Sequence, residues 1–264
     1  MRIPRLALIA PAIGATVACA SLAMLPAASA TATPHAFANG AATSGLAAAH
    51  FDHAGGPAKA AVVTGKKGYN INGYNWSGAA ATGSGFSSVT STWTEPSVTC
   101  HSTNDLMAPW VGIDGYGSST VEQTGVATDC SSGAPVYQAW YEMYPASPVY
   151  YSLTSYPVRA GDRFTGTVSR SGTSYTLTLT NSTRGWTKTT SKSLSASNTS
   201  AEVIIESPTG SYPAFGSVSF SNSSINGSLL ANWNPTLMDA SNGVYEDHTS
   251  AVSGGSFSIS YLHE

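Results

Sequence analysis

Charged residues are scarce in this chain of 264 residues, because Asp, Glu, Lys and Arg together make up only 9% of it. Helix-like apolar periodicity is also absent, whereas Ser, Thr, Tyr, Val and Gly abound. Short alternating segments bounded by Gly, Pro, Asn or Ser recur from Phe86 to Tyr261, and residues 164–180 contain the clearest hairpin, which turns at Ser171-Gly172. This pattern argues against a helical protein and predicts an all-β fold, an antiparallel sandwich or barrel.

The common signatures of hydrolases are missing as well. The chain contains no Gly-x-Ser-x-Gly, His-Glu-x-x-His, Asp-Thr-Gly or Asp-Ser-Gly sequence, and its body has only His101, His248 and His263 for a Ser-His-Asp triad. Nucleotide-binding loops are absent too. Residues 70–264 carry six Lys and Arg against thirteen Asp and Glu. We therefore expect no nucleic-acid partner, because phosphates need a basic face.

The beginning of the chain has the features of an export signal. Arg2 and Arg5 precede an apolar run over residues 6–25, and Ala28-Ser29-Ala30 fits the small-x-small cleavage rule. We assign residues 1–30 to a signal peptide of bacterial type; a membrane anchor is the alternative. Since no second apolar span follows, we expect a secreted protein without membrane attachment once the signal is removed.

The segment that follows the signal differs in composition from the rest. Residues 31–69 are rich in Ala, Gly, Thr and His and cannot bury enough apolar surface to fold alone. We interpret them as a propeptide or a disordered leader that is cleaved between Ala58 and Asn72. Residues 1–69 are basic, so this leader could dock on an acidic body and inhibit it. The remainder, residues 70–264, is long enough for a single domain.

The chain contains only three cysteines. Cys19 leaves with the signal, so Cys100 and Cys130 remain in an exported protein, and we predict a disulfide between them. Two buried thiols are the alternative. The spacing and the count of these cysteines exclude a four-ligand zinc site, and we expect neither a metal nor an organic cofactor.

One strand stands out within the body. In residues 200–208, alternation puts Val203 and Ile205 on one face and Glu202 and Glu206 on the other. Glu206 is the last strand residue, because the proline two positions later cannot donate to a ladder. Taken alone, the two carboxylates favour a solvated sheet face.

Polar and aromatic side chains share a face in further predicted strands. They are Trp110 and Asp114 in one segment, Gln123 in the next, and Gln138, Trp140, Glu142 and Tyr144 in the third. A sheet face lined with aromatic residues and a few acids suits an extended polymer, either a peptide or a sugar chain. The alternative is that these aromatic residues only finish a sheet surface.

Six short segments follow one another in order between about residues 72 and 220. They are Asn75-Trp-Ser-Gly-Ala79, Val89-Thr-Ser-Thr-Trp-Thr-Glu-Pro96, Trp110-Val-Gly-Ile-Asp-Gly115, Glu122-Gln-Thr-Gly-Val126, Gln138-Ala-Trp-Tyr-Glu-Met-Tyr-Pro145 and Ala201-Glu-Val-Ile-Ile-Glu206. Each is weak alone, but their order and spacing resemble the glutamic peptidases, or eqolisins, of the scytalidoglutamic and aspergilloglutamic type. The resemblance implies a β-sandwich of two large antiparallel sheets, a lectin-like jelly roll of the concanavalin A kind.

The resemblance also assigns roles to individual residues. It puts Gln123 and Glu206 on the catalytic pair, and Trp110, Asp114 and Glu142 on residues that line the site. We add Trp76, Trp140 and Tyr144 as further lining residues. The implied activity is that of a secreted, acid-acting endopeptidase on protein and peptide substrates, and we expect a monomer.

Two positions depart from the family pattern. The family usually has Trp where Val203 stands and often Asp where Ser207 stands. The segment between Trp110 and Gln123 is also slightly shorter than in fungal members and lacks a cysteine often found there. These changes leave the substrate preference and the pH optimum open.

The chemistry of the pair agrees with that assignment. One carboxyl group, Glu206, can act as base and then as acid, while the amide of Gln123 orients water and stabilises the oxyanion without titrating. Asp114 and Glu142 nearby would raise the pKa of Glu206 by repulsion, or share a proton with it. A histidine base would be protonated and useless in acid.

Two other functions compete with this interpretation. A glycoside hydrolase on a similar sandwich could use Glu206 with Glu142 or Glu202, although Gln123 would then have no necessary role. A carbohydrate-binding module without catalysis would also use an aromatic face. Asn-x-Ser/Thr sequences begin at Asn75, Asn181, Asn198, Asn222 and Asn226, and in a bacterial protein we expect them to be bare.

Overall fold

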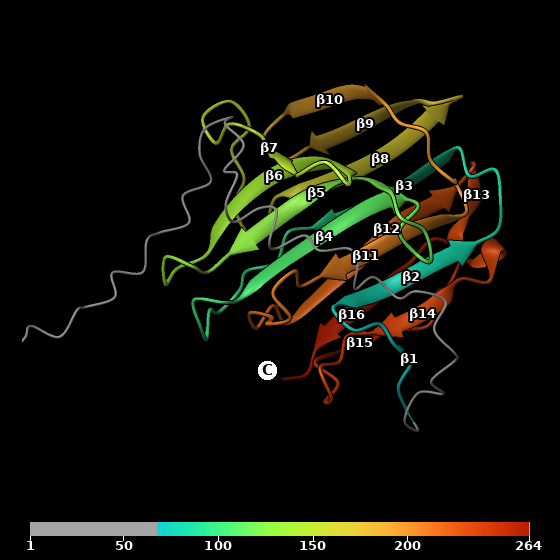
Figure 1. The fold of residues 1–264 in the computed structure, drawn as a ribbon. Coiled ribbons are helices and arrows are strands. Elements are labelled where there is room, and N and C mark those ends of the chain that lie inside the picture. The colour runs from blue at the N-terminus through green and yellow to red at the C-terminus, as the bar shows by residue number, and fades with distance from the viewer. Residues whose placement is uncertain (1–67, 264) are drawn as a thin grey trace, which may run out of the picture. The chain divides into compact units, whose positions relative to one another are not determined.

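The computed structural model describes residues 68–263 (Figure 1). The signal peptide of residues 1–30 and almost all of the expected leader therefore lie outside the described residues. Within the described part, no helix is long and apolar enough to cross a membrane.

Two large sheets make up the described part. The first sheet has eight strands in the order β1-β14-β2-β11-β4-β5-β6-β7. Its members are β1 (Ile71–Asn72), β14 (Thr236–Asp239), β2 (Trp76–Thr82), β11 (Ser200–Glu206), β4 (Leu106–Ile113), β5 (Val121–Asp129), β6 (Val136–Tyr144) and β7 (Val149–Tyr150). All neighbours are antiparallel except β1 and β14 at one edge.

The second sheet lies against the first (Figure 1). Its order is β10-β9-β8-β3-β12-β16-β15, and β13 pairs with β12 beside this path. Its members are β10 (Trp186–Ser193), β9 (Ser174–Asn181), β8 (Arg163–Ser171), β3 (Ser88–Thr94), β12 (Ser217–Ile225), β16 (Phe257–Tyr261), β15 (Asp247–Thr249) and β13 (Ser228–Leu229), with a short 3-10 helix, η2 (Leu230–Trp233), after β13. The predicted antiparallel β-sandwich is confirmed.

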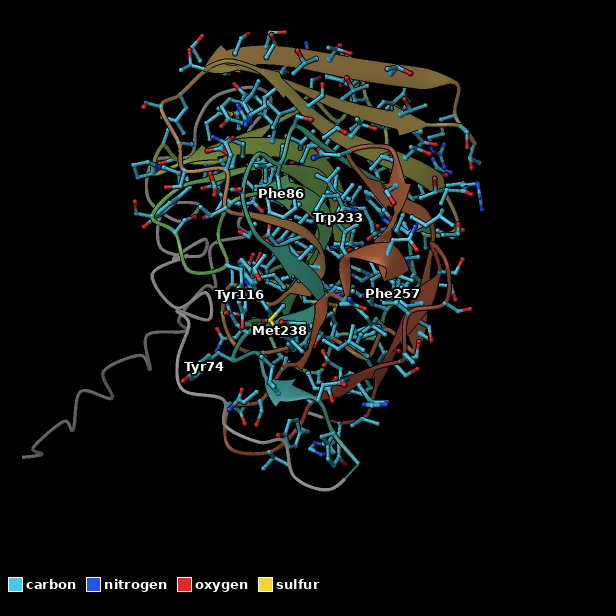
Figure 2. All side chains as sticks on the ribbon, turned by 90° about the vertical axis from the view of Figure 1, so that its right-hand side faces the viewer. Tyr74, Phe86, Tyr116, Trp233, Met238 and Phe257 are labelled. Carbon is cyan, nitrogen blue, oxygen red and sulfur yellow. A yellow bond between two sulfur atoms is a disulfide. The ribbon has the colours of Figure 1, made fainter. Side chains whose placement is uncertain are left out.

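Two apolar clusters lie on opposite faces of the first sheet. The larger fills the space between the sheets; Phe86 and Phe257 belong to it, and the partly buried Trp233 packs against it (Figure 2). The smaller covers the other face of the first sheet. It includes Met238, and the partly buried Tyr116 packs against this cluster (Figure 2). Strands β4, β5 and β11 are therefore buried on both faces, which differs from the half-exposed strands that simple alternation predicts.

Two local predictions are confirmed. Strands β8 and β9 form the expected hairpin, closed by the pair Ser171 and Ser174, and Gly172 adopts a left-handed φ of 59° in the turn. Glycine takes that conformation without the steric cost that a β-carbon brings. Cys100 and Cys130 form the predicted disulfide, which ties the loop after β3 to the end of β5.

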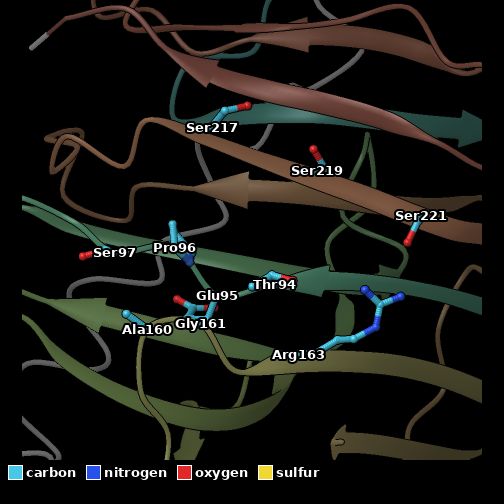
Figure 3. Close-up of a pocket in the computed structure, with 10 residues that line it drawn as sticks. All are labelled: Thr94, Glu95, Pro96, Ser97, Ala160, Gly161, Arg163, Ser217, Ser219 and Ser221. Carbon is cyan, nitrogen blue, oxygen red and sulfur yellow. The ribbon is translucent and has the colours of Figure 1, made fainter. Parts of the chain in front are cut away.

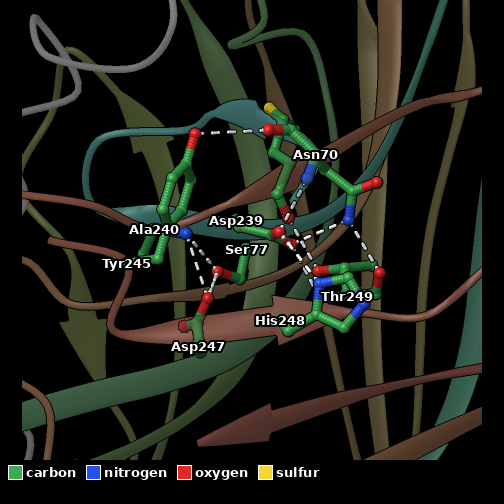
Figure 4. A network of polar contacts seen from close by, with 9 residues as sticks. Asn70, Ser77, Asp239, Ala240, Tyr245, Asp247, His248 and Thr249 are labelled. Carbon is green, nitrogen blue, oxygen red and sulfur yellow. Dashed lines mark hydrogen bonds and ion pairs between the residues drawn. The ribbon is translucent and has the colours of Figure 1, made fainter. Parts of the chain in front are cut away.

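A buried carboxylate fixes the first described residues to the sandwich (Figure 4). Asp239 accepts hydrogen bonds from the backbone and side-chain nitrogens of Asn70, both at 2.8 Å, and from the backbone nitrogen of Thr249 at 2.7 Å. The ring of Tyr69 stacks on that of Tyr245 with 4.1 Å between centroids. The chain is therefore already part of the folded body at Tyr69 and Asn70.

The surface charge differs from the sequence expectation. Every Asp and Glu among the described residues is buried: Glu95, Asp105, Asp114, Glu122, Asp129, Glu142, Asp162, Glu202, Glu206, Asp239, Glu246 and Asp247. The Lys and Arg side chains there are exposed or half-buried. The net charge had indicated an acidic surface, and the described surface is cationic instead. Leader docking stays a prediction, but these residues offer no exposed acids for it. The net-charge argument against nucleic acids also fails.

Candidate active site

Glu206 ends strand β11 and is held at both carboxylate oxygens. The indole nitrogen of Trp110 donates to Oε2 at 3.1 Å, and the amide nitrogen of Asn75 donates to Oε1 at 3.1 Å. Asn75 is itself fixed, because its backbone oxygen accepts from the nitrogen of Ser207 at 2.9 Å. Two neutral donors, one on β4 and one in the turn before β2, thus set the orientation of the Glu206 carboxyl group.

Gln123 lies on β5 directly opposite Glu142 on β6. Its Nε2 donates to Glu142 Oε2 at 2.7 Å. A carboxylate oxygen can only accept, so this contact decides which end of the amide is the nitrogen and fixes the plane of the side chain. The structure therefore brings Gln123 and Glu142 together as a pair of neighbouring, buried side chains.

Strand β4 lies between Gln123 and Glu206. Gln123 is opposite Gly112 and Glu206 is opposite Ala108, and Trp110 stands midway between them on the same face. A β-carbon at Gly112 would come within 2.8 Å of the Trp110 ring. The missing side chain at that position leaves room for the indole along the face that joins the two predicted catalytic residues.

The other predicted aromatic residues lie on this face too. Trp76 is opposite Glu206 in the β2–β11 pair and meets Trp110 edge to face, with 5.0 Å between centroids. Trp140 is buried in the same cluster, and Tyr144 packs against it while half-buried at the end of β6. The structure thus gathers Trp76, Trp110, Trp140 and Tyr144 around the face that carries the candidate pair.

Asp114 is placed differently from what alternation predicts. Strand β4 ends at Ile113, and Asp114 turns into a left-handed conformation with φ of 65°. Its carboxylate accepts from the backbone nitrogens of Asn198 at 2.7 Å and Thr199 at 2.8 Å. These bonds clamp the loop that leads into β11. Asp114 therefore supports the strand of Glu206 from its far end.

Two residues near the pair were missed by sequence reasoning. Asn75 belongs to a segment that carried the resemblance, yet nothing in its spacing indicated a contact with Glu206. Tyr150 on β7 lies opposite Trp140 and is buried. Burial raises the pKa of Tyr150 well above its usual range, and the charges of Glu142, Asp129 and Glu206 raise it further. Its phenol therefore stays neutral.

Several other buried carboxyl groups hold their protons tightly. Burial, and then the charge of Asp114, raises the pKa of Glu122 to about 8. Burial likewise raises the pKa of Glu202, which shares a row of the sheet with Gly112 and Gln123, well above its usual range. The described residues include no group of three or more His, Cys, Asp or Glu that could hold a metal ion.

A separate hollow of about 690 Å³ lies on the second sheet (Figure 3). Thr94, Arg163 and a row of serines on β12 line it. None of the predicted catalytic or site-lining residues contributes to its wall. This hollow is therefore separate from the candidate active site.

Comparison with known proteins finds relatives of this chain. The model of a family described as the peptidase A4 family matches residues 74–261. Aspergillopepsin-2 from Aspergillus niger is 30% identical over 220 residues, which span 71% of this chain and 77% of that protein. Scytalidopepsin B from Scytalidium lignicola is 38% identical over 138 residues, which span 50% of this chain and 51% of that protein.

Solved structures agree with these relatives. The crystal structure of scytalido-glutamic peptidase with a transition state analog inhibitor has a TM-score of 0.62 and 29% identity, and covers 72% of this chain and 98% of that one. A member of the eqolisin family of peptidases in a complex with the tripeptide Ala-Ile-His has a TM-score of 0.60, with the same identity and coverage.

Proposed function

Because the chain belongs to the peptidase A4 family and is a peptide-bond hydrolase, we propose that it is a secreted endopeptidase that acts in acid with Gln123 and Glu206 as its catalytic pair. The observation that carries this proposal is that both side chains are buried on one sheet face and fixed by hydrogen bonds. Trp110 and Asn75 donate to Glu206, and Gln123 donates to Glu142.

The first step is the attack of water on the scissile carbonyl carbon. The Glu206 carboxylate accepts a proton from this water while the oxygen of the water forms a bond to the carbonyl carbon. The carbonyl oxygen gains the negative charge and accepts a hydrogen bond from the amide of Gln123. Glu142 holds one hydrogen of that amide nitrogen, and we assign the second to the oxyanion.

The second step breaks the carbon–nitrogen bond. Glu206, now protonated, gives its proton to the leaving nitrogen as the tetrahedral intermediate collapses, and a carboxylic acid and an amine are released. One group thus serves as base and as acid, so that no second titrating residue is needed. The donors of Trp110 and Asn75 keep its two oxygens in place throughout.

Acid action is supported by the residues around the pair. The hydrogen bonds described above for Gln123 and Glu206 involve amide, indole and carboxyl groups, and the amides and the indole do not titrate as the pH falls. The neighbouring Glu122 and Glu202 hold their protons at low pH, since burial raises the pKa of both. The fold therefore tolerates acid without charging its interior.

Secretion is supported by two features. The first is the export signal expected at residues 1–30, and the second is the disulfide between Cys100 and Cys130. Disulfides persist in oxidising compartments outside the cytoplasm. Both features support a location in an oxidising compartment outside the cytoplasm.

The decisive experiment compares two glutamates of one strand face. The processed protein and its Glu206→Gln and Glu202→Gln variants are incubated with an unfolded protein across acidic to neutral pH, and peptides are identified by mass spectrometry. We expect Glu206→Gln to lose at least about 100-fold in kcat/KM, because general acid–base catalysis contributes that much. Glu202→Gln is the matched control and should keep cleaving.

The outcome also separates the competing function. Equal cleavage by the folded Glu206→Gln variant would remove Glu206 from the mechanism. Release of reducing sugar from a β-glucan by the parent, without peptide products, would indicate a glycosidase instead. Glu142 is less suited to that role, since its Oε2 accepts from Gln123.

A further inference from the structure

A groove of about 450 Å³ opens beside strands β7 and β10, outside the residues assigned to catalysis. Figure 1 shows these two edge strands on the same side of the sandwich. Its wall includes Tyr141, Tyr150, Tyr151, Tyr156, Lys188 and Lys192, together with the hydroxyl groups of serines and threonines. We propose that this groove binds an acidic polysaccharide, with the two lysines pairing with its anionic groups.

The surface charge supports an anionic ligand. Among the described residues every Lys and Arg falls within residues 159–192, which run from the loop before β8 to β10. All described carboxylates are buried, and none lines the groove. A ligand that approaches this wall therefore meets positive charge without competing surface acids, and cationic surfaces attract polyanions over long range.

The positions of the lysines point them at the groove. Lys188 and Lys192 on β10 pair with Leu179 and Tyr175 on β9, whose side chains face the interior. The inward face of β10 thus carries charged residues where its neighbour carries core residues. Lys188 lies over the rings of Tyr151 and Tyr156, with its nitrogen 5.8 and 5.5 Å from their centroids. This contact holds the ammonium group against the groove wall.

The neutral part of the wall favours a sugar chain over other polyanions. Tyr141, Tyr150 and Tyr151 are buried and Lys188 lies over the rings of Tyr151 and Tyr156, so the wall presents hydroxyl groups more than open ring faces. The hydroxyl groups of Ser152 and Thr190 offer hydrogen bonds to sugar hydroxyls. Two lysines are too few to follow a nucleic-acid backbone, whose affinity depends on many phosphate contacts. Carboxylated or sulfated sugars combine the charge and the hydroxyl groups that this wall can bind.

The test measures binding of dextran sulfate to the processed protein at pH 6 and low salt, by affinity electrophoresis. Neutral dextran of the same length, poly-D-glutamate and single-stranded DNA are the comparison probes. We expect dextran sulfate to bind more tightly than each of the others. The double variant Lys188→Gln with Lys192→Gln should bind it about tenfold more weakly, because two exposed charge pairs are lost.

A matched control removes the same amount of charge outside the groove. Arg159 and Arg163 do not line it, so the double variant Arg159→Gln with Arg163→Gln should bind dextran sulfate no more than about twofold more weakly. Lys188→Arg with Lys192→Arg keeps the charge and should bind as the parent does.

Equal losses from both Gln pairs would overturn the proposal, as would equal binding of poly-D-glutamate or DNA, or no binding at all. Aggregation of the lysine variant with unchanged binding would also overturn it, because the lysines would then only protect an edge strand.

Discussion

The two sheets of the sandwich use the same strand geometry but distribute their polar side chains differently. In the second sheet, strands β8 and β9 alternate between buried apolar residues and half-exposed hydroxyl or basic residues. In the first sheet, β4, β5 and β11 are buried throughout and carry Gln123, Glu202 and Glu206 inside. Burying such groups costs free energy unless they are hydrogen-bonded or protonated. The costly polar residues are thus concentrated on the sheet that carries the candidate pair.

The largest effect that we expect is a dependence of stability on pH, which arises from Glu122 in the first sheet and from Glu95 and Asp247 at the second. Burial raises the native pKa of Glu122 to about 8, with the charge of Asp114 adding to it, from an ordinary value of 4.5. Burial raises the pKa of Glu95 and Asp247 to about 8 as well. Between the ordinary values, 4.5 for the two glutamates and 3.8 for Asp247, and the native values the native state binds more protons than the unfolded state. The stability that these three groups contribute is therefore full below their ordinary pKa values and falls as the pH rises towards 8.

Urea unfolding from pH 4 to 8 measures this loss, which should reach several kcal/mol, since each pH unit between native and unfolded pKa corresponds to about 1.4 kcal/mol per group. Glu122→Gln should flatten the slope. Asp105→Asn is the control: burial alone would raise the pKa of Asp105, but hydrogen bonds from His101 and Ser102 lower it. An unchanged slope in Glu122→Gln would contradict this explanation.

The second effect concerns Gly125, against which the backbone of Trp110 packs in the neighbouring strand. A β-carbon at Gly125 would stand 2.2 Å from the backbone oxygen of Pro109 and 2.7 Å from the β-carbon of Trp110. We expect Gly125→Ala to destabilise by about 3 kcal/mol, because overpacking a rigid core forces the backbone to move. In Gly83→Ala the nearest atom would be 3.5 Å away, on Phe86. Equal melting temperatures for the two variants would show that the first sheet yields more easily than its packing suggests.

The third effect is smaller and falls on activity. Asn75→Ala removes one of the donors to Glu206, and a hydrogen bond to a charged group contributes about 1.5–3 kcal/mol. We expect kcat/KM to fall at least about tenfold. Asn72→Ala is the control. Asn72 lies in the same segment before β2, but its side-chain oxygen accepts from the backbone nitrogen of Tyr74 in an exposed turn. A loss of stability without a loss of kcat/KM at acidic pH would assign Asn75 a structural role.

The smallest effect belongs to the outer face of the second sheet. Thr178 and Thr189 share a hydrogen bond between hydroxyl groups that are open to solvent. Thr178→Ala should change the free energy of unfolding by less than about 0.5 kcal/mol, as surface substitutions usually do. A larger loss in urea unfolding would mean that the hydroxyl rows of this sheet stabilise it more than its burial pattern indicates.

Much of the architecture could be predicted from the sequence because local pattern and local chemistry agree. Alternation identified β11 and its two faces, Gly172 marked the hairpin turn, and two cysteines in an exported chain indicated the disulfide. The ordered segments also located Gln123 and Glu142, which the structure brings into contact.

The remainder could not be predicted because it depends on contacts between distant residues. Asn75 reaches Glu206 across 131 positions of sequence. Asp114 leaves the expected face because the strand ends at Ile113, and alternation carries no signal for such an end. Net charge indicated an acidic surface, whereas burial of every described carboxylate reverses the sign of the exposed charge.

The central claim is that Gln123 and Glu206 act together on one intermediate. The most direct test is kcat/KM of Gln123→Ala, Glu206→Gln and the double variant on one unfolded substrate at one acidic pH, with folding checked by melting. Residues that act as a unit give strongly non-additive losses. We predict that the double variant is no slower than the slower single variant. Losses that multiply, or a Gln123→Ala variant as fast as the parent, would contradict the proposed pair.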